Sequence, residues 1–201
     1  MKTTSDLSTQ IPEPAFTRFL FADTRMNVVW TLLRIWLGYE WLHAGWGKIT
    51  NPAGVWVGEK AGVAVSGFLK GALAKTQGDH PDVQGWYASF ITNFALPNAE
   101  LLSYMVAFGE VFVGIALILG LFTGIAAFFG ATMNTNFLFA GTVSSNPLLL
   151  VTAIAIMLAW RVAGQWGLDR FLLPYLGVPG APGKLFKHEP RSPQSPIPPT
   201  A

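Results

Sequence analysis

The sequence predicts an all-α integral membrane protein: a four-helix bundle with amphipathic helices in an extracytoplasmic cap between the first and second spans. Two observations carry this prediction. Residues 111–160 contain no Asp, Glu, Lys or Arg, a run of fifty residues bracketed by Glu110 and Arg161. The chain of 201 residues is 51% hydrophobic and only 12% charged, whereas average soluble domains carry ~25% charged residues. Since one spanning helix needs ~20 apolar residues, the run is too long for a single span.

Turn-forming residues divide the uncharged run into separate spans. Gly120, Thr123 and Gly124 mark one tight turn, and a second turn follows at 141–147, where the sequence is GTVSSNP. Proline is favoured in the first turn of a helix, so Pro147 indicates where the last span begins. The predicted spans are residues 27–47, 99–120, 123–140 and 147–163. With the cap at 48–98 they form one membrane domain over 27–163.

The segments outside the spans differ in composition. The N-terminal segment 1–26 is polar and lacks the basic start and apolar core of a cleaved signal peptide. Within it, the aromatic stretch 14–22 is predicted to lie along the membrane surface, and Asp23 to cap a helix. The cap is expected to hold two amphipathic helices, at 56–75 and 83–95. The tail 164–201 becomes Pro-rich and is predicted to be disordered at its end.

The distribution of basic residues predicts the topology. Four spans place both termini on one side of the membrane, and the cytoplasmic side carries the excess of Lys and Arg. The loop between the first two spans has four basic residues, at 48, 60, 70 and 75. The side with the termini has eight, so both termini are predicted to be cytoplasmic: Lys2, Arg18, Arg25, Arg161, Arg170, Lys184, Lys187 and Arg191.

Composition also excludes several kinds of site. The chain has no Cys, which excludes disulfides, thiolate metal sites and a cysteine nucleophile. The three His, at 43, 80 and 188, do not have the spacing of metal ligands, and no metal, haem or flavin site is expected. The net charge of +2 is too small to indicate a nucleic-acid partner.

Ionisable residues inside the predicted spans are the candidates for function, because a charge in the membrane is costly and needs a partner or a purpose. At 100° per residue, Arg34, Trp41 and Lys48 fall on one stripe of the first span, while Glu40 and His43 fall on the opposite stripe. A helix that is polar on both faces is expected to pack centrally or to meet a partner subunit.

Two carboxylates are predicted near the middle of the membrane. Glu40 lies ~20 Å into the first span and Glu110 ~16 Å into the second, at 1.5 Å per residue. Glu110 shares a face with small residues, so another helix can approach it closely. A buried ion pair with Arg34 is the structural alternative for Glu110. Structural alternatives also stay open for four other polar or amphipathic residues, as interface anchor, packing or interhelical hydrogen bonds: Lys48, Trp41, Asn134 and Asn136.

Four stretches resemble the DoxX/DoxD family, in the correct order along all four spans. They are RIWLGYEWLHAGWGK (34–48), GEVFVGIALILGLFTGIAAFFGATMNTNFLFAG (109–141), NPLLL (146–150) and AWRVAGQWGLDR (159–170). The family consists of small four-helix membrane proteins, and its best-described member, DoxD, is the large subunit of thiosulfate:quinone oxidoreductase, which pairs with a small DoxA subunit. The resemblance implies a multi-pass protein of a prokaryotic cell membrane that oxidises thiosulfate to tetrathionate and passes the electrons to membrane quinone.

This chemistry suggests roles for the polar residues. Quinone reduction consumes two protons, which Glu110, Glu40 and His43 could relay as the catalytic groups. Cationic groups at the outer mouth could attract the thiosulfate dianion, and the expected substrate- and quinone-binding residues are Arg34, Lys48, Asn134, Asn136 and Trp41. The expected partners are membrane lipid, quinone and a DoxA-like small subunit, with a second copy of the chain as a further alternative.

A non-catalytic scaffold that recruits a redox partner through the cap is the alternative function, and transport of a small anion is weaker because four spans leave little room for alternating access. The oxidoreductase should have Glu110, Arg34 and Asn134 lining one cavity, whereas the scaffold should have them paired and buried.

Overall fold

The computed structural model describes residues 13–178, so the predictions for residues 1–12 and for the Pro-rich end lie outside the described residues. Within the described range the chain forms helices and turns without a strand, which confirms the all-α prediction. The helices are α1 Ala15–Ala22, η1 Thr24–Met26, α2 Asn27–Ile49, α3 Val63–Leu73, α4 Gly85–Phe90, the π-helical turn η2 Ile91–Ala95, α5 Ala99–Leu119, α6 Thr123–Phe139, α7 Asn146–Leu158, α8 Trp160–Ala163 and α9 Asp169–Leu176.

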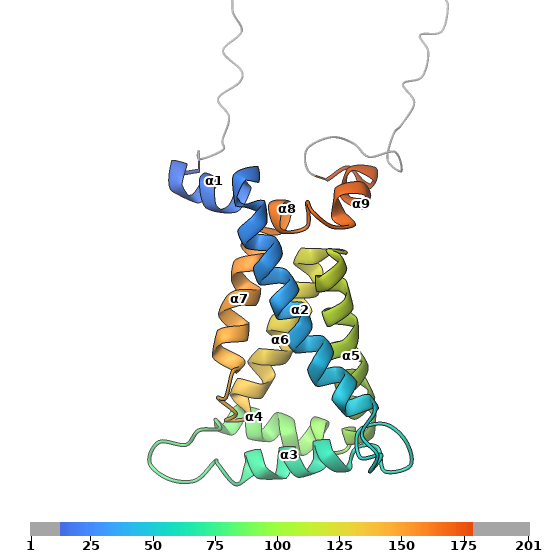
Figure 1. Cartoon of the computed structure of the whole chain (residues 1–201). Coiled ribbons are helices and arrows are strands. Elements are labelled where there is room, and N and C mark those ends of the chain that lie inside the picture. Colours follow the sequence, from blue (N-terminus) through green and yellow to red (C-terminus); the bar gives the residue numbers. More distant parts are fainter. Residues whose placement is uncertain (1–12, 179–201) are drawn as a thin grey trace, which may run out of the picture.

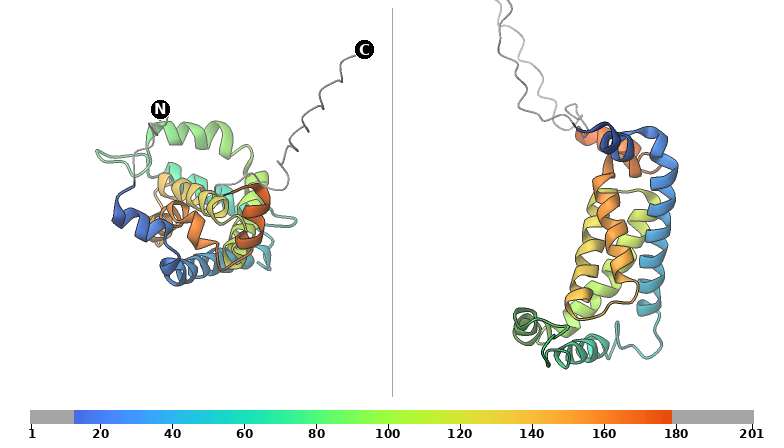
Figure 2. Two further views of the ribbon diagram at one scale, coloured as in Figure 1. Left: turned by 90° about the horizontal axis from the view of Figure 1, so that it is seen from above. Right: turned by 90° about the vertical axis from the view of Figure 1, so that its left-hand side faces the viewer.

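Helices α2, α5, α6 and α7 form an elongated bundle (Figure 1). Helices α3 and α4 lie across one end of it, and α1, α8 and α9 lie at the other end, an arrangement that the side view in Figure 2 repeats. Among the described residues, α5 is the helix that is both long and apolar enough to cross a membrane. Helix α2 is longer but carries four ionisable residues, while α6 has 17 residues and α7 has 13. By length and composition, the described part of the fold therefore establishes one such helix, not four.

Glycines bring α2 and α5 into backbone contact. A Cβ atom placed on Gly38 would lie 2.9 Å from the carbonyl oxygen of Gly114, and one on Gly45 would lie 2.7 Å from the amide nitrogen of Val111. Small residues at a helix interface allow this close approach. The pairing of 38 with 114 and of 45 with 111 also shows that the helices run antiparallel. As a result, the end of α2 at Lys48 lies beside the middle of α5.

The cap differs in detail from the prediction. Its first helix begins at Val63, not near 56, because Gly54, Gly58 and Gly62 have positive φ angles of 62°, 116° and 88° and shape the preceding segment into a loop. The second helix begins at Gly85 and continues into the π-helical turn that ends at Ala95. The cap has its own apolar core, which includes Val65, Leu69, Val83, Tyr87 and Ile91.

Polar contacts tie the cap to the bundle. Lys75 Nζ donates to the carbonyl oxygen of Gly141 at 2.6 Å, and the Tyr87 hydroxyl donates to that of Asn136 at 3.0 Å. Ser103 Oγ on α5 donates to the carbonyl oxygen of Trp56 at 2.7 Å. The first two contacts hold the part of the cap that follows α3 against α6 and the turn after it, and the third holds the loop between α2 and α3 against α5.

The last described segment closes the opposite end. Asp169 is 2% exposed, and its two carboxylate oxygens accept hydrogen bonds from the backbone N–H groups of Phe122 and Thr123 at 2.6 and 2.8 Å. The backbone N–H groups of Leu168 and Asp169 donate to the carbonyl oxygens of Leu119 and Gly120. A carboxylate at the start of a helix satisfies N–H groups that have no partner within the helix. The Gly-Leu-Asp sequence at 167–169 thus fastens the tail to the turn between α5 and α6.

Candidate functional site

A buried ion pair joins α2 to α5. Lys48 Nζ lies 2.6 Å from Glu110 Oε2, and the exposed fractions of the two side chains are 20% and 2%. The same Nζ atom lies 5.0 Å from the centroid of the Trp56 ring. Because the loop carrying Trp56 is held to α5, its indole shields the ammonium group. The end of the bundle next to the cap therefore contains an opposite-charge pair that Trp56 shields.

The structural alternative that paired Glu110 with Arg34 is wrong, because Glu110 is bonded to Lys48 instead. The antiparallel packing of α2 on α5 places Arg34 near the other end of α5. There its guanidinium, 1% exposed, donates to the carbonyl oxygens of Leu117 and Ile118. Carbonyl groups in the last turn of a helix lack partners within the helix and interact favourably with a cation. In this structure Arg34 caps α5.

Two further predicted residues present unpaired polar atoms inside the bundle. Trp41 is 3% exposed and Asn134 is fully buried. Among residues 13–178, Trp41 Nε1 has no hydrogen-bond partner, and neither does Oδ1 or Nδ2 of Asn134. Gly130, one turn before Asn134 on α6, faces the indole, since a Cβ atom there would lie 3.0 Å from Trp41 Nε1. Buried polar atoms normally have partners. Within the described chain, Trp41 and Asn134 therefore leave donors and an acceptor without partners in the interior of the bundle.

These atoms lie on the helices that surround the ion pair. Val113 Cγ1 would be 3.4 Å from a Cβ atom on Gly130, which places α6 against α5 one turn from Glu110. Met133, the residue before Asn134 in the sequence, has its Sδ 3.7 Å from the position of a Cβ atom on Gly109. We refer to Lys48, Glu110, Trp41 and Asn134 as the interior polar cluster.

Asn136 belongs to the cap contact and not to this cluster. Its Oδ1 accepts from the Tyr87 hydroxyl at 3.2 Å, and its Nδ2 donates to the carbonyl oxygen of Thr132 at 2.8 Å. Burial raises the pKa of Tyr87, so the phenol keeps the proton that it donates. The side chain of Asn136 therefore has partners that fix it between α6 and the cap.

Glu40 and His43 lie on the outward side of α2, away from the interior polar cluster. His43 is exposed and Glu40 is half-buried. The His43 ring stacks on Tyr39, with ring centroids 5.8 Å apart and planes at 20°. The structure thus brings Glu110 and Lys48 together but separates Glu40, His43 and Arg34 from them.

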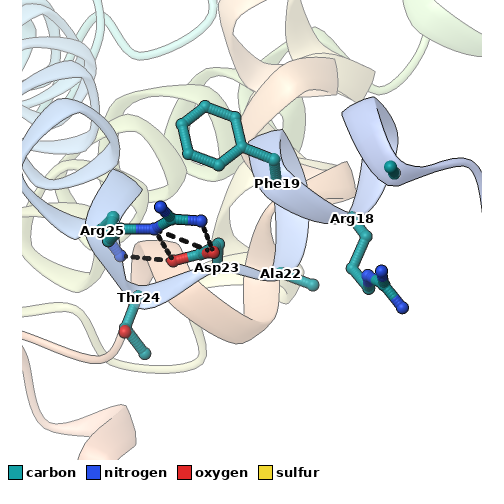
Figure 3. A pocket seen from close by; sticks show the side chains of 7 residues that line it. Arg18, Phe19, Ala22, Asp23, Thr24 and Arg25 are labelled. Atoms are coloured by element: carbon teal, nitrogen blue, oxygen red, sulfur yellow. Dashed lines mark hydrogen bonds and ion pairs between the residues drawn. The ribbon is translucent and has the colours of Figure 1, made fainter.

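Two surface depressions lie elsewhere. One, of about 550 Å³, is lined by residues of α1 and η1, where Arg25 is bonded to Asp23 (Figure 3). Hydrogen bonds from the Arg25 side chain and backbone hold the pKa of Asp23 at about 2. The other, of about 530 Å³, lies between α3 and the start of α5. Neither depression is lined by a predicted site residue. The oxidoreductase was expected to have Arg34 and Glu110 lining one cavity, and neither depression contains these two residues.

The sequence interpretation missed two residues of this arrangement. Trp56, which falls at the start of the helix expected over 56–75, instead lies in a loop and covers Lys48. Asp169 was part of a family motif without an assigned role, although Asp is a residue that commonly caps the start of a helix.

The helical bundle, with charged and amide side chains buried among apolar helices, defines a class of small all-helical proteins with a polar interior. Residues 29–160 match the family described as DoxX. The chain therefore belongs to the DoxX family, whose members are membrane proteins. No curated protein and no solved structure matches the chain at a significant level.

Proposed function

We propose that this protein is the membrane subunit of a quinone-reducing oxidoreductase that oxidises thiosulfate to tetrathionate. The observation that carries the proposal is the interior polar cluster: a buried Lys48–Glu110 pair on helices that also present the unpaired polar atoms of Trp41 and Asn134. In a membrane, ionisable residues that face the bundle interior mark substrate and proton pathways.

The proposal places α2, α5, α6 and α7 across a prokaryotic cell membrane. Helix α2 has 23 residues, ~35 Å at 1.5 Å per residue, which exceeds the ~30 Å of a hydrocarbon core. Large apolar side chains also point outward along the bundle; Phe112 is 68% exposed and Phe128 is 51% exposed. The described ends of the chain lie at the same end of the bundle, opposite the cap (Figure 1). This arrangement supports the proposal, made from the distribution of basic residues, that both termini are cytoplasmic.

The interior polar cluster suits the proton chemistry of quinone reduction. Two thiosulfate ions couple to one tetrathionate and release two electrons, and a quinone takes up two electrons and two protons to become a quinol. The Trp41 N–H and the Asn134 amide would hydrogen-bond the quinone oxygens. Glu110 would deliver protons to them, and Lys48 would keep the carboxylate in place between deliveries. A DoxA-like small subunit is the proposed partner on the donor side, and quinone is the co-substrate.

The test is quinone reduction by the purified protein in detergent. Thiosulfate-dependent reduction of a soluble quinone is followed by absorbance, with and without co-purifying proteins. We expect Glu110→Gln, which keeps the shape but cannot titrate, to lose most of the turnover per folded molecule. Glu100→Gln is the matched control, because it is the same substitution at an exposed position of the same helix, α5. A wild-type protein with no activity in either preparation, or a Glu110→Gln variant with unchanged turnover, would contradict the proposal.

The second candidate is a non-catalytic scaffold that recruits a redox partner through its cap, for which buried and paired Glu110 and Arg34 were the expected outcome. Glu110 is already paired, and Arg34 caps a helix instead of lining a site with Glu110. A scaffold would retain its partner after Glu110→Gln and release it after substitutions in α3 or α4. Co-purification of the partner with these variants separates the two functions.

A further inference from the structure

The outward face of α2 carries polar groups where a membrane helix would meet lipid. Tyr39 is 58% exposed, His43 is exposed and Glu40 is half-buried. Among residues 13–178 neither the Glu40 nor the His43 side chain has a hydrogen-bonding or ion-pair partner. Glu40 lies 13 residues from the start of a 23-residue helix, so it sits near the middle of the membrane. Polar and ionisable side chains at this depth are costly when they face lipid.

We propose that this face, defined by Tyr39, Glu40 and His43, is the contact surface for a second copy of the chain in a two-fold symmetric dimer. The inference rests on the membrane placement proposed above, but not on quinone chemistry. It accounts for the two ionisable residues that the interior polar cluster does not use.

The chemistry of the face is self-complementary. Copies that insert with the same orientation are related by an axis along the membrane normal, so equivalent residues meet at equal depth. Glu40 is an acceptor and His43 can donate through an imidazole N–H. They lie three residues apart, ~4.5 Å along the axis, a distance that side chains can bridge. A two-fold contact therefore pairs Glu40 of each copy with His43 of the other, twice, as an isologous interface requires.

The stacking of His43 on Tyr39 fixes the imidazole on this face. Two aromatic residues border the same surface, since Trp36 is 36% exposed and Trp46 is 60% exposed. The surface thus combines flat aromatic groups with one acceptor and one donor.

Charge exchange tests the pairing. Glu40→His places imidazole opposite imidazole, and His43→Glu places carboxyl opposite carboxyl, so each single variant replaces the carboxylate–imidazole pairing in both contacts with a weaker like-with-like contact. The double variant restores the carboxylate–imidazole pairing with exchanged positions. Interhelical polar contacts in membranes are worth enough that losing two should weaken the dimer about tenfold. Fluorescence energy transfer between labelled copies in proteoliposomes, over a range of lipid-to-protein ratios, measures the change. A double variant no better than the singles would overturn the pairing.

Disulfide cross-linking provides an independent test that does not depend on the stability of these variants. The chain has no Cys, so any disulfide between two copies must form at the single cysteine that is introduced. Tyr39→Cys should form a disulfide-linked dimer in native membranes. Phe112→Cys, on the outward side of α5 and 68% exposed, is the control and should stay monomeric; the pairing of Gly38 with Gly114 puts Phe112 near the depth of Glu40.

Cross-linking at position 112 but not 39 would overturn the interface, as would cross-linking of Tyr39→Cys to a different protein alone. Quinone reduction by the unmodified protein is measured separately, so a failure of the dimer proposal can be told apart from a failure of the proposed function.

Discussion

Breaking the Lys48–Glu110 pair should destabilise the protein more than removing it altogether. Removing one partner of a buried pair costs ~3–5 kcal/mol, because it leaves an unpaired charge, whereas replacing both partners is often neutral. The Glu110 side chain is 2% exposed but that of Lys48 is 20% exposed, so water relieves part of the penalty. We therefore expect ~3 kcal/mol for Lys48→Met or Glu110→Gln, at the lower end of the range.

The assay is thermal unfolding in detergent of wild type, both single variants and the double variant. For a chain of this size ~3 kcal/mol corresponds to a fall in Tm of ~6–12 °C. The double variant should recover most of this loss yet remain inactive with quinone, since it has no titrating carboxylate. Single variants within ~1 kcal/mol of wild type would refute the reasoning, as would a double variant as unstable as the worse single.

Three further outcomes follow from the structure. A membrane-impermeant maleimide added outside intact cells should label Asp79→Cys in the cap but not Arg170→Cys near the tail; labelling of only the latter would reverse the topology. Asp169→Ala should cost ~2–4 kcal/mol, because two N–H groups lose a charged acceptor, and a thermal shift below 2 °C would contradict the clamp. The Asp23 carboxyl, monitored by NMR, should titrate with a pKa of about 2, returning toward 3.8 in Arg25→Gln. Because folding lowers the pKa of Asp23, the stabilising effect of the Asp23–Arg25 contact is present above pH ~4 and is lost as pH falls toward ~2. A titration midpoint near 3.8 in the wild-type protein would show that the contact is absent.

The sequence predicted the helices well because their signals are local. An uncharged run, turn residues and Pro147 place α5, α6 and α7 within a few residues, except that α7 ends at Leu158 and a short α8 follows. The inward stripe of α2 was also predictable, because a period of 3.6 residues separates Arg34, Trp41 and Lys48 from Glu40 and His43.

Side-chain partners were less predictable because they depend on how two helices align. The sequence interpretation named only Arg34 as an ion-pair partner for Glu110, whereas the structure pairs Glu110 with Lys48. That pairing follows from backbone contacts at Gly38, Gly45 and Gly114, which set the register of α2 on α5. The cap loop over Lys48 was missed for a related reason, since three glycines with positive φ replace the expected start of a helix.

The most direct test of the central claim is to locate a bound quinone. A photoreactive quinone analogue is illuminated in membranes containing the protein, and the labelled peptides are mapped by mass spectrometry. The account predicts labelling of α2, α5 or α6 close to Trp41, Glu110 and Asn134, competed by excess unmodified quinone. Labelling confined to the cap or to the outward face of α2, or labelling that excess quinone does not reduce, would contradict it.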